Sequence, residues 1–302
     1  MATEKNIRNT FLKSPMNYTG GKHKLLPQLI PLIQGNDNDN SKPIRNFIDL
    51  FTGGANVVIN IHPTGKRIAN DIDSRLIGIY KTFQSHSLEE IINHIESRIK
   101  EFNLSQTNKE GYLKLRELYN NGQEEKDKNP LDLFTLICYS FNNQIRFNSK
   151  SQFNIPFGER SFNSSTRNKL QLFHQAIQDI TFLSLPFQRV NLLDNPNVTN
   201  EDYVYCDPPY LITCASYNEN GGWGEKEEKE LLSLMDSLNE RNIRFGLSNV
   251  FQNKGKRNEL LIEWCNKNNY TVHHLNHSYS NCSYHAKDRE SITDEVFITN
   301  QQ

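Results

Sequence analysis

Short apolar runs alternate along this chain with longer stretches whose hydrophobic residues recur at helical spacing. We expect strands in the apolar runs that end in turn residues, at 44–51, 67–69, 180–185, 202–206, 243–248, 270–275 and 294–299. We expect helices at 55–61, 74–83, 88–102, 108–119, 130–141, 169–178, 226–238 and 258–266. This alternation predicts an α/β fold built on a largely parallel sheet.

One part of the chain departs from the alternation. Between 88 and 141 three helical segments follow one another with no strand between them. The next segment, 142–160, is polar and poor in helix formers, and its FNIPFG run suggests a hairpin or an irregular loop. We therefore expect a sheet-bearing core at 1–85 and 170–302, and an inserted unit of helices plus a hairpin at 86–169.

The composition limits the classes of protein. The chain has 302 residues, 36% hydrophobic and 23% charged, which excludes disorder, collagen and coiled coil. Lys and Arg number 34 and Asp and Glu 35, so no global positive field indicates a nucleic-acid partner. The five scattered cysteines do not form a disulfide framework. With no signal sequence and no long apolar run, we expect a cytoplasmic protein that does not span a membrane.

A glycine turn follows the first expected strand and points to a bound nucleoside. Gly53 and Gly54 leave room for a ligand to approach the backbone, although such a turn alone is often only structural. Asp71 ends the next strand, where a carboxylate can accept both hydroxyls of a ribose. The run GGANVV does not complete the GxGxxG pattern that holds a pyrophosphate, so S-adenosylmethionine fits better than NAD.

The second candidate site is Asp207-Pro208-Pro209-Tyr210, which directly follows the apolar run DYVYC. The prolines have no backbone N–H, so their carbonyls and the Asp207 carboxylate present only acceptors. Acceptors suit an exocyclic amine: they can take both amino hydrogens and direct the nitrogen lone pair at a methyl sulfonium. Tyr210 could stack on the base, which is worth about 1 to 3 kcal/mol. A helix-terminating turn is the structural alternative.

These motifs together are recognisable as a family pattern. NYTGGK at 17–22, DLFTGG at 49–54, NDID at 70–73 and YCDPPY at 205–210 follow in the order found in Dam-type DNA adenine-N6 methyltransferases, the D12 class with the alpha order of motifs. The likeness extends through RFNSKSQFNIPFGER and the closing TDEVFITN, and it looks closest to the Dam enzymes of T-even bacteriophages. The resemblance implies a Rossmann-like class I methyltransferase fold with an inserted target-recognition domain.

The resemblance also assigns cofactor and catalytic residues. It implies S-adenosylmethionine as the cofactor, held near the Gly53 turn and Asp207. The further cofactor residues that it implies are Tyr18, Lys22, Phe51, Asp71 and Phe187, with the two phenylalanines flanking the adenine. The catalytic residues that it implies are Asp207, Pro208, Pro209 and Tyr210. One departure is Ala55, which stands where many relatives carry a second glycine.

DNA contacts must be local in a chain without net positive charge. The segment 141–189 has six basic residues against two acidic ones, and the first 35 residues have five against one. Solvated basic loops are the simpler explanation of either patch. The resemblance favours contacts with double-stranded DNA, most often at the adenine of GATC flipped out of the duplex. It implies that the contacting residues are Phe141, Gln144, Arg146, Pro156 and Arg160.

Other readings of the sequence stay open. The same fold could methylate cytosine N4 or RNA, or a silent relative could bind DNA without catalysis; an NAD-dependent oxidoreductase is opposed by the missing pyrophosphate loop. The group His273, His274, His277, Cys282 and His285 has enough ligands for zinc but no paired-Cys knuckle, so we expect no metal. We expect no obligate protein partner and a monomer or weak dimer.

Overall fold

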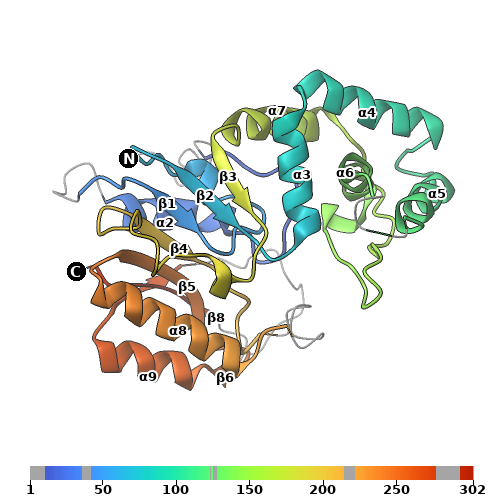
Figure 1. Ribbon diagram of the computed structural model, residues 1–302. Helices are drawn as coiled ribbons and strands as arrows, with labels where there is room; N and C mark the ends of the chain where they lie inside the picture. The colour runs from blue at the N-terminus through green and yellow to red at the C-terminus, as the bar shows by residue number, and fades with distance from the viewer. Residues whose placement is uncertain are drawn as a thin grey trace, which may run out of the picture.

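A central eight-stranded sheet organises the chain in the computed structural model (Figure 1). The structure describes residues 11–35, 42–122, 124, 128–213, 222–276 and 293–301. The strand order is β3-β2-β1-β4-β5-β8-β7, with β6 pairing β5. The strands are β1 (Phe47–Asp49), β2 (Arg67–Asn70), β3 (Ile180–Leu183), β4 (Tyr203–Cys206), β5 (Arg244–Asn253), β6 (Lys256–Arg257), β7 (Thr271–Leu275) and β8 (Thr293–Thr299).

The strand directions confirm the expected Rossmann-like α/β sheet. Strands β1 to β5 run parallel to their neighbours along the path, whereas β8 is antiparallel to both β5 and β7. Successive residues of a strand point to opposite faces, and here both faces are buried. Phe47 and Tyr205 belong to one hydrophobic cluster, whereas Ile48 and Val204 belong to the other. Burial on both faces explains why these runs read as continuously apolar.

Helices cover both faces of the sheet. On one side lie α8 and α9, and on the other the helices that follow β2 extend away from the sheet (Figure 1). The helices are α2 (Leu26–Gln34), α3 (Ser74–Ser85), α4 (Leu88–Glu101), α5 (Lys109–Asn120), α6 (Pro130–Tyr139), α7 (Ser164–Ala176), α8 (Glu225–Glu240) and α9 (Glu259–Asn268). None of the helices in the described segments is long and apolar enough to cross a membrane.

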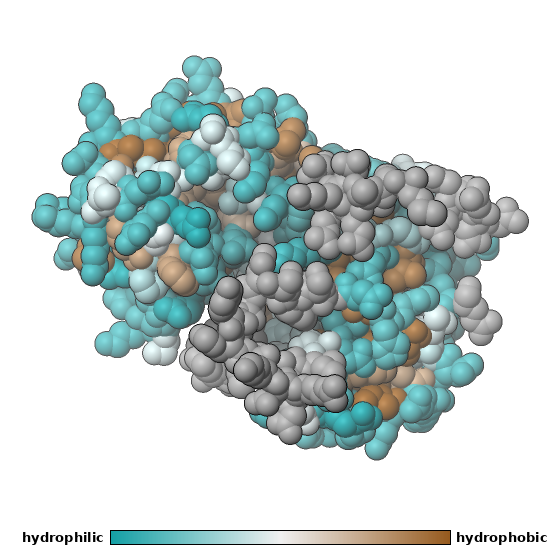
Figure 2. Space-filling view, turned by 180° about the vertical axis from the view of Figure 1, so that it is seen from behind, coloured by the Kyte–Doolittle hydropathy of each residue, from teal (hydrophilic) through white to brown (hydrophobic). Residues whose placement is uncertain are grey.

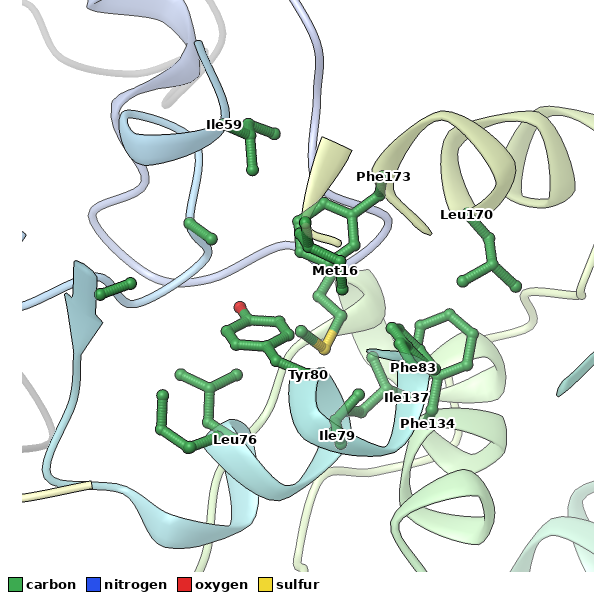
Figure 3. Packing of buried hydrophobic residues seen from close by; sticks show 14 of the residues in the cluster. Met16, Ile59, Leu76, Ile79, Tyr80, Phe83, Phe134, Ile137, Leu170 and Phe173 are labelled. Atoms are coloured by element: carbon green, nitrogen blue, oxygen red, sulfur yellow. The ribbon is translucent and has the colours of Figure 1, made fainter. Parts of the chain in front are cut away.

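The connection from β2 to β3 carries the helices α3 to α7. Side chains start several of these helices: Ser87 and Glu90 form a capping box before α4, and Asn129 accepts from the Leu131 amide at the start of α6. Aromatic packing joins these helices to one another, because Phe83 of α3 lies 5.0 Å, between ring centroids, from Phe134 of α6 and contacts Phe173 of α7 (Figure 3). These residues share one hydrophobic cluster with β1.

This shared core bears on the expected division of the chain. The boundary expected at 169 falls inside α7, and residues of α4, α5 and α6 belong to the same cluster as α2 and β1. The division into a core at 1–85 and 170–302 and an insertion at 86–169 stays a prediction. Over the opposite side of the molecule the surface is largely hydrophilic, with hydrophobic residues in separate small patches (Figure 2).

Several elements differ from the expected ones, among them the two-residue strand β6, which was not expected. Instead of a helix at 55–61 there is only the 3-10 helix η2 (Val58–Asn60), since β-branched residues crowd this stretch. The Asn56 and Asn60 side chains there accept from the Ser14 and Leu12 amides. Helix α2 was not expected at all, because its two prolines conceal the helical pattern.

The order of the strands creates a site at one edge of the sheet. From β1 the chain continues on one side to β2 and β3, whereas β4 and β5 lie on the other side. Where the order reverses in this way, a crevice opens outside the carboxyl ends of the two strands, and ligands of doubly wound sheets bind there. In this protein the reversal lies between β1 and β4.

Candidate active site

Three carboxylates gather at the carboxyl edge of the sheet. Asp49 is the last residue of β1, Asp71 directly follows β2, and Asp207 directly follows β4. Burial raises the pKa of the Asp71 carboxyl to about 6 and the pKa of Asp49 well above its usual value; the charges of Asp207 and Asp71 raise that of Asp49 further. A cationic ligand is the natural complement of such a group of buried acids.

The glycine turn brings Tyr18 and Asp71 together. Gly53 has a φ of +44° and its amide donates to Asp71 Oδ2 over 2.9 Å, while the Asp73 amide donates to Oδ1. A Cβ on Gly53 would lie 2.9 Å from a ring carbon of Tyr18, so only glycine fits beneath this ring. Ala55 adopts a φ of 58°, a left-handed conformation that glycine would take without strain.

Phe51 and Phe187, expected to lie on either side of the adenine ring, instead contact each other and Trp223. Their ring centroids are 5.4 Å apart, and Trp223 lies 5.6 Å from Phe51 and 5.8 Å from Phe187. A ring held between two others needs about 7 Å from centroid to centroid, twice a normal contact distance of about 3.5 Å. An adenine can therefore lie against this cluster, but not between the two phenylalanines as they stand.

Lys22 and Tyr210 bind the Asp207 carboxylate. Lys22 begins the 3-10 helix η1 (Lys22–Leu25) and is 5% exposed. Its Nζ lies 2.9 Å from Asp207 Oδ1, 3.4 Å from Glu295 Oε1 and 3.0 Å from the Gly20 carbonyl oxygen. The Tyr210 hydroxyl lies 3.0 Å from Asp207 Oδ1 and 3.2 Å from Glu295 Oε1. The first residue of the motif is thus held by the motif's own Tyr210 and by Lys22, which is distant in the sequence.

The charges in this cluster affect one another. Burial raises the pKa of the Asp207 carboxyl, the Lys22 ammonium opposes that shift, and the Glu295 charge adds to it. Burial disfavours the charge on Lys22, but the two carboxylates outweigh it and raise the pKa of the ammonium. Burial and the same carboxylates raise the pKa of the Tyr210 hydroxyl well above its usual value. Lys22 therefore stays protonated and Tyr210 remains a donor at neutral pH.

The expected recognition segment is tethered to the end of α6. The Phe141 amide donates to the Pro156 carbonyl over 2.9 Å, and the Gly158 amide donates to the Tyr139 carbonyl over 3.0 Å. A Cβ on Gly158 would lie 2.2 Å from the Ser140 carbonyl oxygen, so this approach requires glycine. Phe141 and Pro156, expected to face DNA, are thereby brought together, and Phe141 is 53% exposed.

The other three expected DNA-contacting residues lie along the same segment. Arg146 is exposed and donates through Nε to the Asn154 side chain over 2.9 Å. Arg160 is exposed and makes no hydrogen bond or ion pair with any other residue that the structure describes. Gln144 is half-buried, and its amide donates to the Phe141 carbonyl. The segment thus offers two arginines from one surface loop.

Comparison with known proteins identifies the family. The model of the D12 class of N6 adenine-specific DNA methyltransferases matches residues 18–281, which include the predicted catalytic and cofactor residues. The chain belongs to this D12 class. Its cofactor is therefore S-adenosylmethionine.

Among curated members of the D12 class and related methylases, the type II methyltransferase M.FokI of Planomicrobium okeanokoites is 46% identical over 98% of this chain and 44% of its own length. The modification methylase StsI of Streptococcus sanguinis is 41% identical over 97% of this chain and 43% of its own length. The DNA adenine methylase of Escherichia coli K12 is 25% identical over 78% of this chain and 79% of its own length.

These comparisons correct one expectation and show that the chain matches only part of M.FokI and of StsI. The likeness is stronger to the two methylases than to the DNA adenine methylase, so the expected special closeness to the Dam enzymes of T-even bacteriophages is not supported. The D12 chain spans less than half the length of M.FokI and of StsI.

The sequence did not single out two buried or apolar residues at the D12 site. Glu295 is 6% exposed and contacts both Lys22 and Tyr210, but in the sequence it is an ordinary polar residue of an apolar strand. Ile72 is a large apolar residue that is 71% exposed beside Asp71, which its place inside NDID could have indicated. Trp223 packs on Phe51 and Phe187. Of the histidine and cysteine group, only His273 and His274 lie within the described residues.

Proposed function

We propose that this protein transfers a methyl group from S-adenosylmethionine to the N6 amino group of an adenine in double-stranded DNA. One observation carries the proposal: Asp207, the first residue of the DPPY motif, is fixed by a buried ammonium at the carboxyl ends of β1 and β4, beside Asp49 and Asp71. This arrangement places a hydrogen-bond acceptor for an amine next to a site that suits a cation.

The residues at the carboxyl edge fit the cofactor. Two of its groups carry positive charge, the sulfonium and the α-ammonium, and the ionised forms of the buried carboxyls Asp49 and Asp71 would complement that charge. Asp71 is placed to accept from the ribose hydroxyls, with Gly53 and Tyr18 beside it. The exposed Ile72 gives the adenine an apolar surface. We assign the cofactor to Tyr18, Lys22, Phe51, Gly53, Asp71, Phe187 and Asp207; Lys22 and Asp207 form its border with the substrate.

Asp207 and the Pro208 carbonyl would prepare the amine. When bound, S-adenosylmethionine supplies a methyl carbon that N6 bonds as the carbon–sulfur bond breaks, with the electron pair going to sulfur and one N6 proton leaving. Because the adenine amine shares its lone pair with the ring, it is a poor nucleophile. Acceptance of its hydrogens by Asp207 and Pro208 favours tetrahedral nitrogen and stabilises its developing charge. Pro209 stiffens this turn, and Tyr210 stacks on the flipped base.

Recognition of the DNA is assigned to the loop after α6. Arg146 and Arg160 are suited to bidentate contact with guanine, each such pair being worth about 1 to 3 kcal/mol of discrimination. The exposed Phe141 can wedge into the step that base flipping opens, with Gln144 and Pro156 at the base edges. We propose GATC as the target, since the loop resembles that of enzymes which methylate it. The enzyme would act as a monomer or weak dimer on DNA in the cytoplasm of a bacterial or phage-infected cell.

Transfer of labelled methyl groups tests the function. With duplex DNA and tritiated S-adenosylmethionine, the label should enter the DNA and resist removal of protein and RNA. RNA and protein substrates of equal concentration serve as controls. Label that enters only RNA would show that RNA and not DNA is the substrate. No incorporation into DNA, RNA or protein would support a DNA-binding protein without catalytic activity.

The raised pKa of Asp71 predicts a pH dependence of cofactor binding. The carboxyl has a pKa of about 6, so lowering the pH through 6 protonates it and removes an acceptor from the ribose. We expect the dissociation constant for S-adenosylmethionine to rise by about tenfold between pH 7.5 and pH 5. Isothermal titration calorimetry measures this change. The Asp71→Asn variant should bind S-adenosylmethionine weakly and without this pH dependence. If its pH profile equals that of the parent protein, Asp71 is not the group that causes the dependence.

Arg160 provides a test of sequence recognition. Because its guanidinium is exposed and has no partner among the described residues, Arg160→Ala should leave stability and cofactor affinity unchanged. We expect the preference for the correct base at one target position to fall by about 5- to 150-fold, the loss of one bidentate contact. Sequencing of methylated sites in a random duplex library measures it. Arg167→Ala, which removes a half-exposed arginine paired with Glu96, is the matched control. Unchanged preference at every position would refute the role of Arg160.

A further inference from the structure

Glu295 reaches the site from a strand that runs against the others. Strand β8 is antiparallel to β5, and Glu295 pairs with Val250 near the carboxyl end of that strand. The start of β8 therefore lies at the same edge of the sheet as the ends of the parallel strands. This topology brings a carboxylate from the last strand next to the DPPY motif, although β5 separates β8 from β4.

The four polar groups of this cluster form a closed set of contacts. Lys22 Nζ and the Tyr210 hydroxyl each contact both Asp207 Oδ1 and Glu295 Oε1, at distances from 2.9 to 3.4 Å. Lys22 has three N–H donors, and the Gly20 carbonyl accepts the third. The hydroxyl has one proton, which it can give to either carboxylate. Glu295 therefore shares both donors that hold Asp207.

We infer that Glu295 is a positioning residue for methyl transfer, which through Lys22 and Tyr210 holds the Asp207 carboxylate in its working orientation. The inference rests on the proposed function and adds a residue to it. Glu295 is 6% exposed, and the register pairs it with apolar residues, Val250 on β5 and Leu275 on β7. A buried carboxylate among apolar neighbours is costly unless polar partners compensate it, and its partners here are the two residues that bind Asp207.

Two consequences for the reaction follow from this geometry. Lys22 and Tyr210 both contact Oδ1 of Asp207, and no described residue donates to Oδ2, which stays available for the adenine amine. The cluster also holds two carboxylates against one ammonium, so its net charge is negative. A net negative charge stabilises the positive charge that develops on N6 as the methyl group arrives. Glu295 contributes to both effects without touching the base.

Glu295→Gln tests the inference, because it keeps the shape and one acceptor oxygen but removes the charge. Under single-turnover conditions we expect the rate of methyl transfer to fall by about 10- to 100-fold, while dissociation constants for cofactor and DNA change by less than about threefold. Asp294→Asn is the matched control: it changes the neighbouring residue of β8, which pairs with His274 at the surface, and should keep the parent rate. Thermal melting verifies that both variants fold.

The pH profile separates positioning from a general structural defect. The ionisable groups that face Glu295 are Lys22 from η1, Asp207 and Tyr210 from the loop after β4, and Tyr205 from β4. The Glu295 charge raises the pKa of Asp207, so its removal should shift the acidic limb of the rate profile to lower pH while the plateau falls. A defect in folding alone would lower the plateau without this shift.

The outcomes distinguish the inference from the function that it rests on. If the parent protein transfers no methyl group to DNA, the proposed function fails. If the parent is active and Glu295→Gln keeps its rate within about twofold, or loses rate and both affinities together without a shift of the acidic limb, Glu295 has no positioning role. A lower plateau, a shifted acidic limb and unchanged affinities in an active parent support it.

Discussion

Asp207→Ala should abolish methyl transfer, with a loss of about 10³-fold or more in the single-turnover rate, while DNA binding changes by only a few-fold. The physical reason is that Asp207 supplies the charged acceptor for the amine, and charged groups aimed at developing charge contribute the largest catalytic effects. Filter binding to the target duplex and incorporation of labelled methyl measure the two quantities separately.

The structure predicts that this variant still folds. After Asp207 is removed, Lys22 retains Glu295 and the Gly20 carbonyl as partners. Asp207→Asn is the matched variant, since it keeps the shape and one acceptor oxygen, and should retain more activity than Asp207→Ala. Substantial methyl transfer by Asp207→Ala would show that the amine is oriented by other groups.

Lys22→Met should lower the free energy of unfolding by about 3–5 kcal/mol, more than the other substitutions considered, because it removes the ammonium between two buried carboxylates. Without Lys22 the pKa of Asp207, which burial already raises, loses its main opposing influence and rises further. The unfolded chain has an ordinary carboxyl, so the variant keeps its stability at acid pH and loses it as the pH rises through the folded pKa. Urea unfolding at pH 5 and pH 8 measures the difference.

A second substitution checks the cause of that loss. In Lys22→Met with Glu295→Gln, one of the two like charges is gone, so part of the lost stability should return at pH 8. Lys24→Met, a neighbouring lysine of η1, is the control and should behave as the parent protein. Equal losses at both pH values, with no recovery in the double variant, would mean that packing and not charge explains the effect of Lys22.

The sequence predicted the parts of the site that directly follow strands. Asp71 and Asp207 stand at the ends of apolar runs, and the carboxyl ends of parallel strands meet at one edge. The apolar runs and the helical spacing of hydrophobic residues also predicted most strands of the sheet and most helices. Helix α2 could not, since Pro27 and Pro31 stand where helices usually begin or break.

Residues that act through tertiary contact could not be predicted. Glu295 belongs to the polar start of β8, where a residue normally faces water, and only the pairing of β8 with β5 places it beside Lys22. The contact between Phe51 and Phe187 likewise depends on the loop after β3, whose path no periodicity encodes. In the recognition loop the sequence indicated arginines and aromatics, but not that Arg146 is held by Asn154 whereas Arg160 has no described partner.

Identification of the methylated atom tests the central claim most directly. Duplex DNA of random sequence would be treated with the protein and S-adenosylmethionine, digested to nucleosides and analysed by mass spectrometry, with the sequence context read in parallel. We predict N6-methyladenine as the product in the parent protein, none with Asp207→Ala, and GATC as the context. N4-methylcytosine, or methyl groups at carbon, would contradict the proposal that the DPPY motif presents an adenine amine to the methyl group.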